Sequence, residues 1–149
     1  MRAVIQRVSS ANVSVDGQMV GSIGAGLMVL LGVEEEDSLK DLQYIFNKTT
    51  GLRVFEDQQG KMNLPLSAIG GELLVVSQFT LLGDVRKGKR PSFIKAAKPE
   101  LANQYYKQFI QMAREGGISV ASGIFQADMS VSLVNEGPVT ILLDSRKQF

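Results

Sequence analysis

The sequence predicts a β-rich mixed α/β fold, in which packed, barrel-like β-sheets are covered on one side by two helices. Two observations support this fold class. Most apolar residues fall in short alternating or continuous runs of strand length, bounded by glycine or polar residues. Only two segments carry apolar residues at helical spacing. Because 149 residues is the usual length of one domain, we expect a single domain over residues 1–149.

The first part of the chain predicts four strands. The runs "AVIQRV" at 3–8 and "ANVSV" at 11–15 are typical of successive strands. The Asp-Gly pair that follows signals a hairpin to the next run, "MVGSI" at 19–23. "GLMVLLGV" at 26–33 is continuously apolar, which indicates a strand buried on both faces.

Both helices have recognisable ends. Ser38 can cap the first helix and Gly51 can end it. The second helix begins at Pro99, because proline suits the first helical position, and ends at the Gly-Gly pair that starts at Gly116. The apolar stripes are Leu39, Leu42, Ile45 and Phe46 in the first helix, and Leu101, Tyr105, Phe109 and Met112 in the second.

Four later runs also predict strands, at 52–55, 72–82, 123–134 and 139–144. Between the last two stands Asn-Glu-Gly-Pro, where a hairpin tip would place Asn-Gly or Asp-Gly. Its proline, Pro138, has no backbone N–H, fixes φ, and allows a cis peptide bond at small energetic cost. A rigid element without a donor therefore separates two strands.

The composition excludes several kinds of chemistry. The chain has no cysteine and no histidine, so it lacks thiolate nucleophiles, disulfides, and the commonest general base and metal ligand. We expect no metal and no cofactor, and any catalysis must use carboxylates, hydroxyls, lysines, backbone amides or substrate groups. Without a signal-like start or a membrane-length apolar run, we expect a cytoplasmic protein that does not act in a membrane.

A basic segment is defined by residues 86–98, which hold six cationic side chains and no acid: Arg86, Lys87, Lys89, Arg90, Lys95 and Lys98. Two interpretations stand. Charged loops are common, and this one can be simply solvated. Alternatively, it can contact nucleic-acid phosphates, with Phe93 either stacking on a base or anchoring the loop.

The run "VVSQFTLL" places polar side chains inside an apolar strand. Ser77, Gln78 and Thr80 need hydrogen-bond partners if buried, so they either satisfy neighbouring backbone or face a pocket. Thr80 has no histidine to activate it, and as a nucleophile it would need a lysine or a substrate group nearby.

Two separated motifs resemble the signatures of the D-aminoacyl-tRNA deacylase family. "SQFTL" at 77–81 resembles the first, and "NEGPVT" at 135–140 matches the N-x-G-P-x-T pattern of the second. The runs "IQRV", "GKMNL", "RPSF" and "DMSVSLVN" fall at similar places, so the resemblance covers essentially the whole chain.

The resemblance implies hydrolysis of the ester between a D-amino acid and the tRNA 3′-terminal adenosine, with the adenosine 2′-OH assisting. It implies that the amides around Phe79 and Thr80 donate to the ester carbonyl and that Thr80 and Gln78 shape the site. Ser77 completes the predicted catalytic set. A chain without histidine can then be a hydrolase, because oriented backbone donors are often the largest catalytic contribution.

The resemblance also implies a homodimer with composite active sites. A cis Gly137–Pro138 unit enters the partner's site and excludes L side chains, while Arg7 braces that unit. Met129 lines the adenine pocket, and Phe93 belongs to the substrate-binding set. Glycine has no side chain to exclude, so glycyl-tRNA mischarged on tRNA(Ala) is an expected second substrate.

Two alternatives remain open from the sequence. The protein can be a non-catalytic dimer that holds tRNA or another RNA through its basic segment. It can also be a hydrolase in which Thr80 forms a covalent intermediate.

Overall fold

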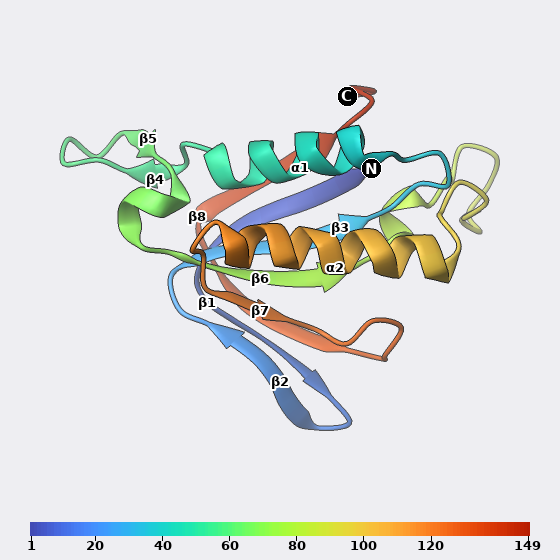
Figure 1. Ribbon diagram of the computed structural model, residues 1–149, viewed down its shortest axis with the longest axis horizontal. Coiled ribbons are helices and arrows are strands. Elements are labelled where there is room, and N and C mark those ends of the chain that lie inside the picture. Colours follow the sequence, from blue (N-terminus) through green and yellow to red (C-terminus); the bar gives the residue numbers. More distant parts are fainter.

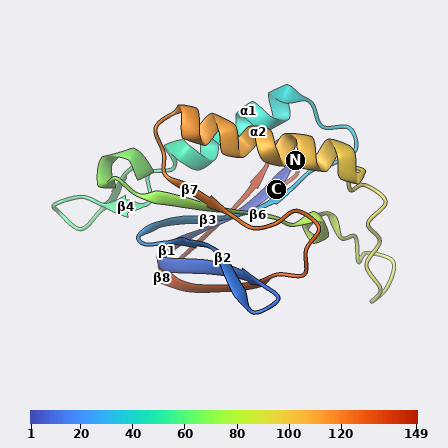
Figure 2. The same ribbon diagram turned by 60° about the horizontal axis from the view of Figure 1, so that its bottom comes forward.

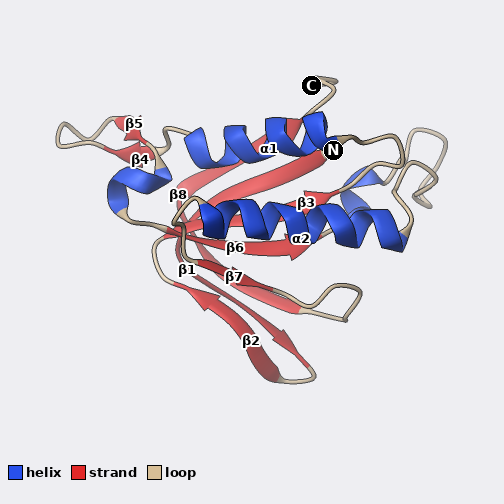
Figure 3. Cartoon of the chain, viewed as in Figure 1, coloured by secondary structure: helices blue, strands red, loops and turns tan.

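The computed structural model describes all 149 residues. In chain order the elements are β1 (Arg2–Val15), β2 (Gln18–Ile23), β3 (Gly26–Gly32), α1 (Leu39–Gly51), β4 (Phe55–Glu56), β5 (Met62–Leu64), η1 (Leu66–Ile69), β6 (Glu72–Ser77), η2 (Phe79–Leu82), α2 (Pro99–Glu115), β7 (Val120–Ser122) and β8 (Ser130–Asp144). Figure 3 shows that strands dominate and that α1 and α2 lie side by side.

The strands form one strongly curved six-stranded sheet, ordered β2-β1-β3-β6-β7, with β8 paired to β1. The first half of β1 pairs with β3 and the second half with β2, while β8 follows β1 along both halves. The sheet curls until β2 packs against β7: a Cβ on Gly21 would lie 2.8 Å from the Ser122 carbonyl oxygen. The predicted barrel-like, β-rich mixed α/β fold is therefore confirmed.

Both helices cover one side of the sheet (Figures 1 and 2). Strand β3 is buried on both faces, as predicted. Leu27, Val29 and Leu31 belong to the core beneath the helices, and Met28 belongs to a second core inside the curled sheet. Since side chains alternate along a strand, one apolar run can serve both cores.

The predicted helix boundaries are confirmed to within a residue, because local capping decides them. The Asp41 carboxylate accepts hydrogen bonds from the Ser38 N–H (2.9 Å) and the Ser38 hydroxyl (2.8 Å) at the start of α1. Pro99 is the first residue of α2. No helix is both long and apolar enough to cross a membrane.

Several predicted strand boundaries were wrong. The runs at 3–8 and 11–15 form one continuous strand, β1, because β8 pairs along its whole length. Of residues 52–55, only Phe55 is in a strand, where it pairs with Leu64 in a small separate sheet.

The other two corrections concern residues that later prove important. The run at 72–82 leaves the sheet after Ser77 and turns into the 3₁₀ helix η2. Residues 123–129 are not a strand: the Ala127 N–H donates to the Ile124 carbonyl (3.2 Å), and Gln126 has a φ of 64°, so the chain turns there.

Candidate active site

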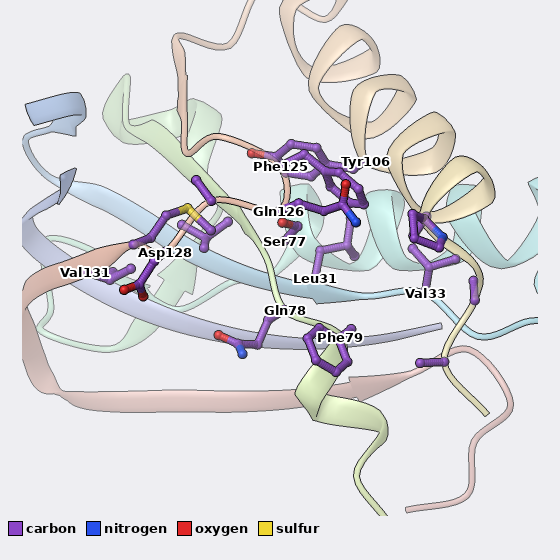
Figure 4. A pocket seen from close by; sticks show the side chains of 17 residues that line it. Leu31, Val33, Ser77, Gln78, Phe79, Tyr106, Phe125, Gln126, Asp128 and Val131 are labelled. Carbon is purple, nitrogen blue, oxygen red and sulfur yellow. The ribbon is translucent and has the colours of Figure 1, made fainter. Parts of the chain in front are cut away.

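A cavity of about 580 Å³ lies where the end of β6 meets the start of α2 and the loop between β7 and β8. Its lining is mostly apolar, and Asp128 is the one charged side chain in it. Figure 4 shows the rings of Phe79, Tyr106 and Phe125 around this space. A cavity of this size and composition is typical of a small-molecule site.

The first signature forms one edge of the cavity, lined by Ser77, Gln78 and Phe79. The Gln78 N–H still donates to the Leu31 carbonyl of β3, at 2.8 Å. The first hydrogen bond of the following turn runs from the Leu81 N–H to the Gln78 carbonyl, at 3.3 Å. The N–H groups of Phe79 and Thr80 precede that bond and have no acceptor within the turn.

Thr80 does not line the cavity and is exposed. Its hydroxyl accepts a hydrogen bond from the Gln78 side-chain amide. An amide cannot take up a proton from the hydroxyl, so this neighbour orients Thr80 without activating it as a nucleophile.

The opposite wall comes from α2 and the loop before β8. The Tyr106 hydroxyl lies 2.9 Å from the Val75 carbonyl and 3.3 Å from the Gly123 carbonyl, and it ties β6 to the start of that loop. Burial raises the pKa of Tyr106, so its hydroxyl remains a donor. Met129 lines the same wall.

Phe93 reaches the site through Phe79. The two rings pack edge to face, with centroids 5.1 Å apart, although Phe93 itself does not line the cavity. Its position favours the anchoring interpretation, because the packing holds the basic segment beside the cavity mouth.

The basic segment is attached at both ends and otherwise exposed. Asp84 and Ser92 exchange backbone hydrogen bonds of 2.8 and 2.9 Å, and the Ala97 N–H donates to the Val33 carbonyl at 2.9 Å. The Arg86 guanidinium donates to the Asp84 carboxylate at 2.9 and 2.6 Å and lowers the pKa of that carboxyl. The remaining cations of the segment form no ion pair within the chain.

The second signature is not a hairpin tip. Gln6 pairs with Thr140 and Val8 with Asn135, so two steps along β1 face five steps along β8. Residues 136–139 therefore leave the ladder as a bulge, which we call the Gly-Pro bulge, and its Gly137–Pro138 bond is cis.

Side chains of the signature close the base of this bulge. The Asn135 amide accepts a hydrogen bond from the Val139 N–H (3.1 Å) and donates one to the Thr140 hydroxyl (3.0 Å). These two contacts account for the asparagine and the threonine of the N-x-G-P-x-T pattern.

Arg7 supports the Gly-Pro bulge from β1. Arg7 as a whole is only 8% exposed, and its guanidinium donates to two carbonyls: Glu136 at 3.1 Å and Val54 at 2.6 Å. A Cβ on Gly137 would lie 2.8 Å from Arg7 Nη2, and the φ of Gly137 is 121°. Only glycine fits both the space and the backbone conformation here.

The two signatures do not meet within one chain. Arg7 pairs with Leu27 on β3, whereas Ser77 pairs with Leu31 on the same strand. Four residues along a strand correspond to roughly 13 Å. The fold thus gathers Ser77, Gln78, Phe79 and Met129 at the cavity and leaves Gly137, Pro138 and Arg7 elsewhere.

Comparison with known proteins identifies the family. Residues 4–144 match the family model of D-Tyr-tRNA(Tyr) deacylase. The chain belongs to this family. D-aminoacyl-tRNA deacylases from Kosmotoga olearia and Natranaerobius thermophilus are 60% and 57% identical to it, over the full length of both chains in each case. The resemblance of the two signatures is confirmed at the level of the family, whose members are hydrolases.

Two solved structures have the same fold. A structure described as c-Myc DNA unwinding element binding protein has a TM-score of 0.91 and 41% identity, and the match covers 97% of this chain and 98% of that one. A probable eukaryotic D-amino acid tRNA deacylase has a TM-score of 0.75 over 95% of this chain and 97% of that one. Its 18% identity shows likeness of fold alone.

Sequence reasoning missed several residues of this deacylase-family cavity. Tyr106 lies beside the predicted apolar stripe of α2, and Gln126 and Asp128 fall in a run that was predicted to be a strand. No local pattern distinguishes these positions, because tertiary packing alone brings the loop against β6. No three acidic side chains converge as metal ligands.

Proposed function

We propose that this protein hydrolyses the ester bond of D-aminoacyl-tRNA and releases the D-amino acid and the tRNA. The observation that carries the proposal is that Phe79, whose N–H is unused by the turn, lines a mostly apolar cavity, with the unused Thr80 N–H next to it in the chain. Membership of the deacylase family and the names of the full-length relatives support it.

The reaction requires little from side chains. The oxygen of a water molecule attacks the ester carbonyl, and the developing oxyanion accepts hydrogen bonds from the backbone amides near Phe79. The 2′-OH of the terminal adenosine assists the proton transfer, and the 3′ oxygen leaves with a proton. Orientation within the cavity supplies the rest of the acceleration.

Selectivity requires a second copy of the chain. Because Arg7, which holds the Gly-Pro bulge, is offset from Ser77 by roughly 13 Å along the strands of one chain, the bulge completes the cavity of a partner in a homodimer. Its carbonyls leave room for a hydrogen at Cα and none for an L side chain. Glycyl-tRNA passes such a steric gate. Arg7 fixes the position of the bulge, because its guanidinium donates hydrogen bonds to the carbonyls of both Glu136 and Val54.

Replacing Phe79 by proline and by leucine tests the role of the backbone amide. Both variants lose the ring contact with Phe93, whereas only Phe79→Pro loses the N–H. We expect the kcat of Phe79→Pro for D-tyrosyl-tRNA to fall roughly 10²-fold or more below that of Phe79→Leu. Circular dichroism and thermal unfolding establish that both variants are folded.

The wild-type protein provides the reference for this test. We expect turnover of D-tyrosyl-tRNA and none of L-tyrosyl-tRNA, with slow turnover when the terminal 2′-OH is absent. No acyl-enzyme should accumulate after rapid quenching. Equal kcat values for the two Phe79 variants would contradict the amide mechanism, and an ester trapped on Thr80 would establish the covalent alternative.

Nucleic-acid binding without hydrolysis is the second candidate. The solved structure that is 41% identical is described as a DNA unwinding element binding protein, and most cations of the basic segment here form no ion pair. Tight binding of uncharged tRNA by a wild-type protein that leaves D-tyrosyl-tRNA intact would favour this candidate.

A further inference from the structure

Gln126 adopts a backbone conformation that its residue type disfavours. Its φ of 64° is in the left-handed region, which it shares with only two other non-glycine residues, Asp16 and Lys147. The Ala127 N–H donates to the Ile124 carbonyl, so Gln126 occupies the third position of a tight turn. Glycine or asparagine is usual there. A glutamine at this position needs a reason other than the turn.

The side chain of Gln126 lines the cavity. Figure 4 shows its side chain among those that line this space, together with Phe125 and Ser77. The amide forms no hydrogen bond within the chain, so its donor and its acceptor are both available to a ligand. The neighbouring rings of Tyr106 and Phe125, with centroids 6.0 Å apart, provide an apolar surface beside it.

We infer that Gln126 recognises the adenine base of the tRNA 3′-terminal nucleotide. The inference rests on the proposed function. An amide can accept a hydrogen bond from the exocyclic N6 amine and donate one to N7, which is the usual pairing of glutamine with adenine. Asp128 can only accept, Ser77 lies at the catalytic edge, and the Gln78 amide already donates to the Thr80 hydroxyl. Gln126 is therefore the lining side chain whose donor and acceptor both match the adenine edge, next to rings on which a base can stack.

Changing the base tests this role directly. D-Tyrosyl-tRNA is prepared with adenosine, purine riboside or inosine at the 3′ end. Purine riboside lacks the N6 amine, and inosine carries an acceptor in its place. We expect the wild-type kcat/KM to be about 10-fold or more higher for adenosine than for either analogue. In Gln126→Gly the preference should fall to about 1, with the change mainly in KM.

Two further variants separate recognition from folding. Gln126→Asn keeps the amide and tolerates the left-handed backbone, so it should restore part of the preference. Asp16→Gly relieves a similar backbone conformation in the β1–β2 turn, far along the chain from the cavity, and should leave the wild-type preference unchanged. Gln126→Gly should be at least as heat-stable as the wild type, because glycine suits this φ.

The outcomes distinguish this inference from the proposed function. A wild-type protein that hydrolyses all three substrates equally, or a Gln126→Gly variant that keeps the wild-type preference, would overturn the role of Gln126 while deacylation stands. A wild-type protein that hydrolyses none of the three contradicts the proposed function itself.

Discussion

At the scale of single residues, hydrogen bonds between side chains and backbone hold the Gly-Pro bulge. Asn135 binds the Val139 N–H, and Arg7 binds the carbonyls of Glu136 and Val54. A buried guanidinium without a carboxylate partner is costly, so its hydrogen bonds must fix a conformation that the fold needs. Here that conformation is the Gly-Pro bulge.

Asp41 illustrates how a single carboxylate couples stability to pH. Burial alone would raise its pKa, but hydrogen bonds from the Ser38 backbone, the Ser145 hydroxyl and the Ser38 hydroxyl lower it to about 2. A lowered acid pKa stabilises the folded state above the unfolded value near 4, and this stabilisation is lost as the pH falls toward 2.

Asp41→Asn should therefore destabilise the protein in a pH-dependent way. After allowance for solvent screening at a partly exposed site, we expect a loss of about 1 kcal/mol in the free energy of unfolding at pH 6. The difference from the wild type should shrink toward zero near pH 2. Urea unfolding between pH 2 and 6 measures it.

The variant comparison cancels the carboxylates that Asp41 does not influence. Asp37 keeps a smaller contribution, because burial raises its pKa and the neighbouring Asp41 charge raises it further. Asp16→Asn, in an exposed turn, is the control. A difference between Asp41→Asn and the wild type that stays constant down to pH 2 would contradict the assignment.

At the scale of elements, the basic segment is a loop held at both ends with its cations in solvent. Arg86 is engaged by Asp84, which leaves Lys87, Lys89 and Arg90 as the unpaired cations of the loop tip. Because Phe93 packs on Phe79, the segment that carries these charges is anchored at the edge of the cavity.

Replacing these three cations by glutamine should weaken tRNA binding and flatten its salt dependence. Each lost phosphate contact should reduce the slope of log K against log salt by roughly 0.7 to 0.9. Filter binding of uncharged tRNA at salt concentrations from about 50 to about 200 mM measures this slope.

The matched control replaces three other exposed lysines, Lys40, Lys48 and Lys61. It changes the net charge by the same amount and should leave the slope near that of the wild type. If both triple variants behave alike, the segment is only solvated charge.

At the scale of the whole molecule, the separation of the signatures predicts complementation between defective chains. Phe79→Pro damages the catalytic turn, and Gly137→Ala places a methyl group against Arg7. In a homodimer with composite sites, the mixed dimer holds one intact site. An equimolar mixture allowed to exchange subunits should recover up to about a quarter of the wild-type activity.

Size-exclusion chromatography with light scattering must first show that both variants are dimers. If the activity of the mixture only equals the mean of the two separate variants, the site is not composite. The Gly-Pro bulge would then act within its own chain.

The sequence by itself determined the helix ends, the first hairpin and the family, because capping, turn chemistry and signature spacing are local properties of the chain. Ser38, Gly51 and Pro99 mark their boundaries without help from distant residues. Through the first signature it also indicated three residues that line the cavity, Ser77, Gln78 and Phe79.

Only the tertiary structure decided how those residues are arranged. The sequence favoured two strands around a hairpin tip, but pairing with β1 makes β8 a single strand with a bulge. The residues of η2 were predicted to continue a strand, but they leave the sheet and pack against Gly32. Tyr106 and Gln126 join the cavity through contacts between α2, β6 and the loop before β8. Such contacts depend on residues far apart in the chain, so no local pattern could reveal them.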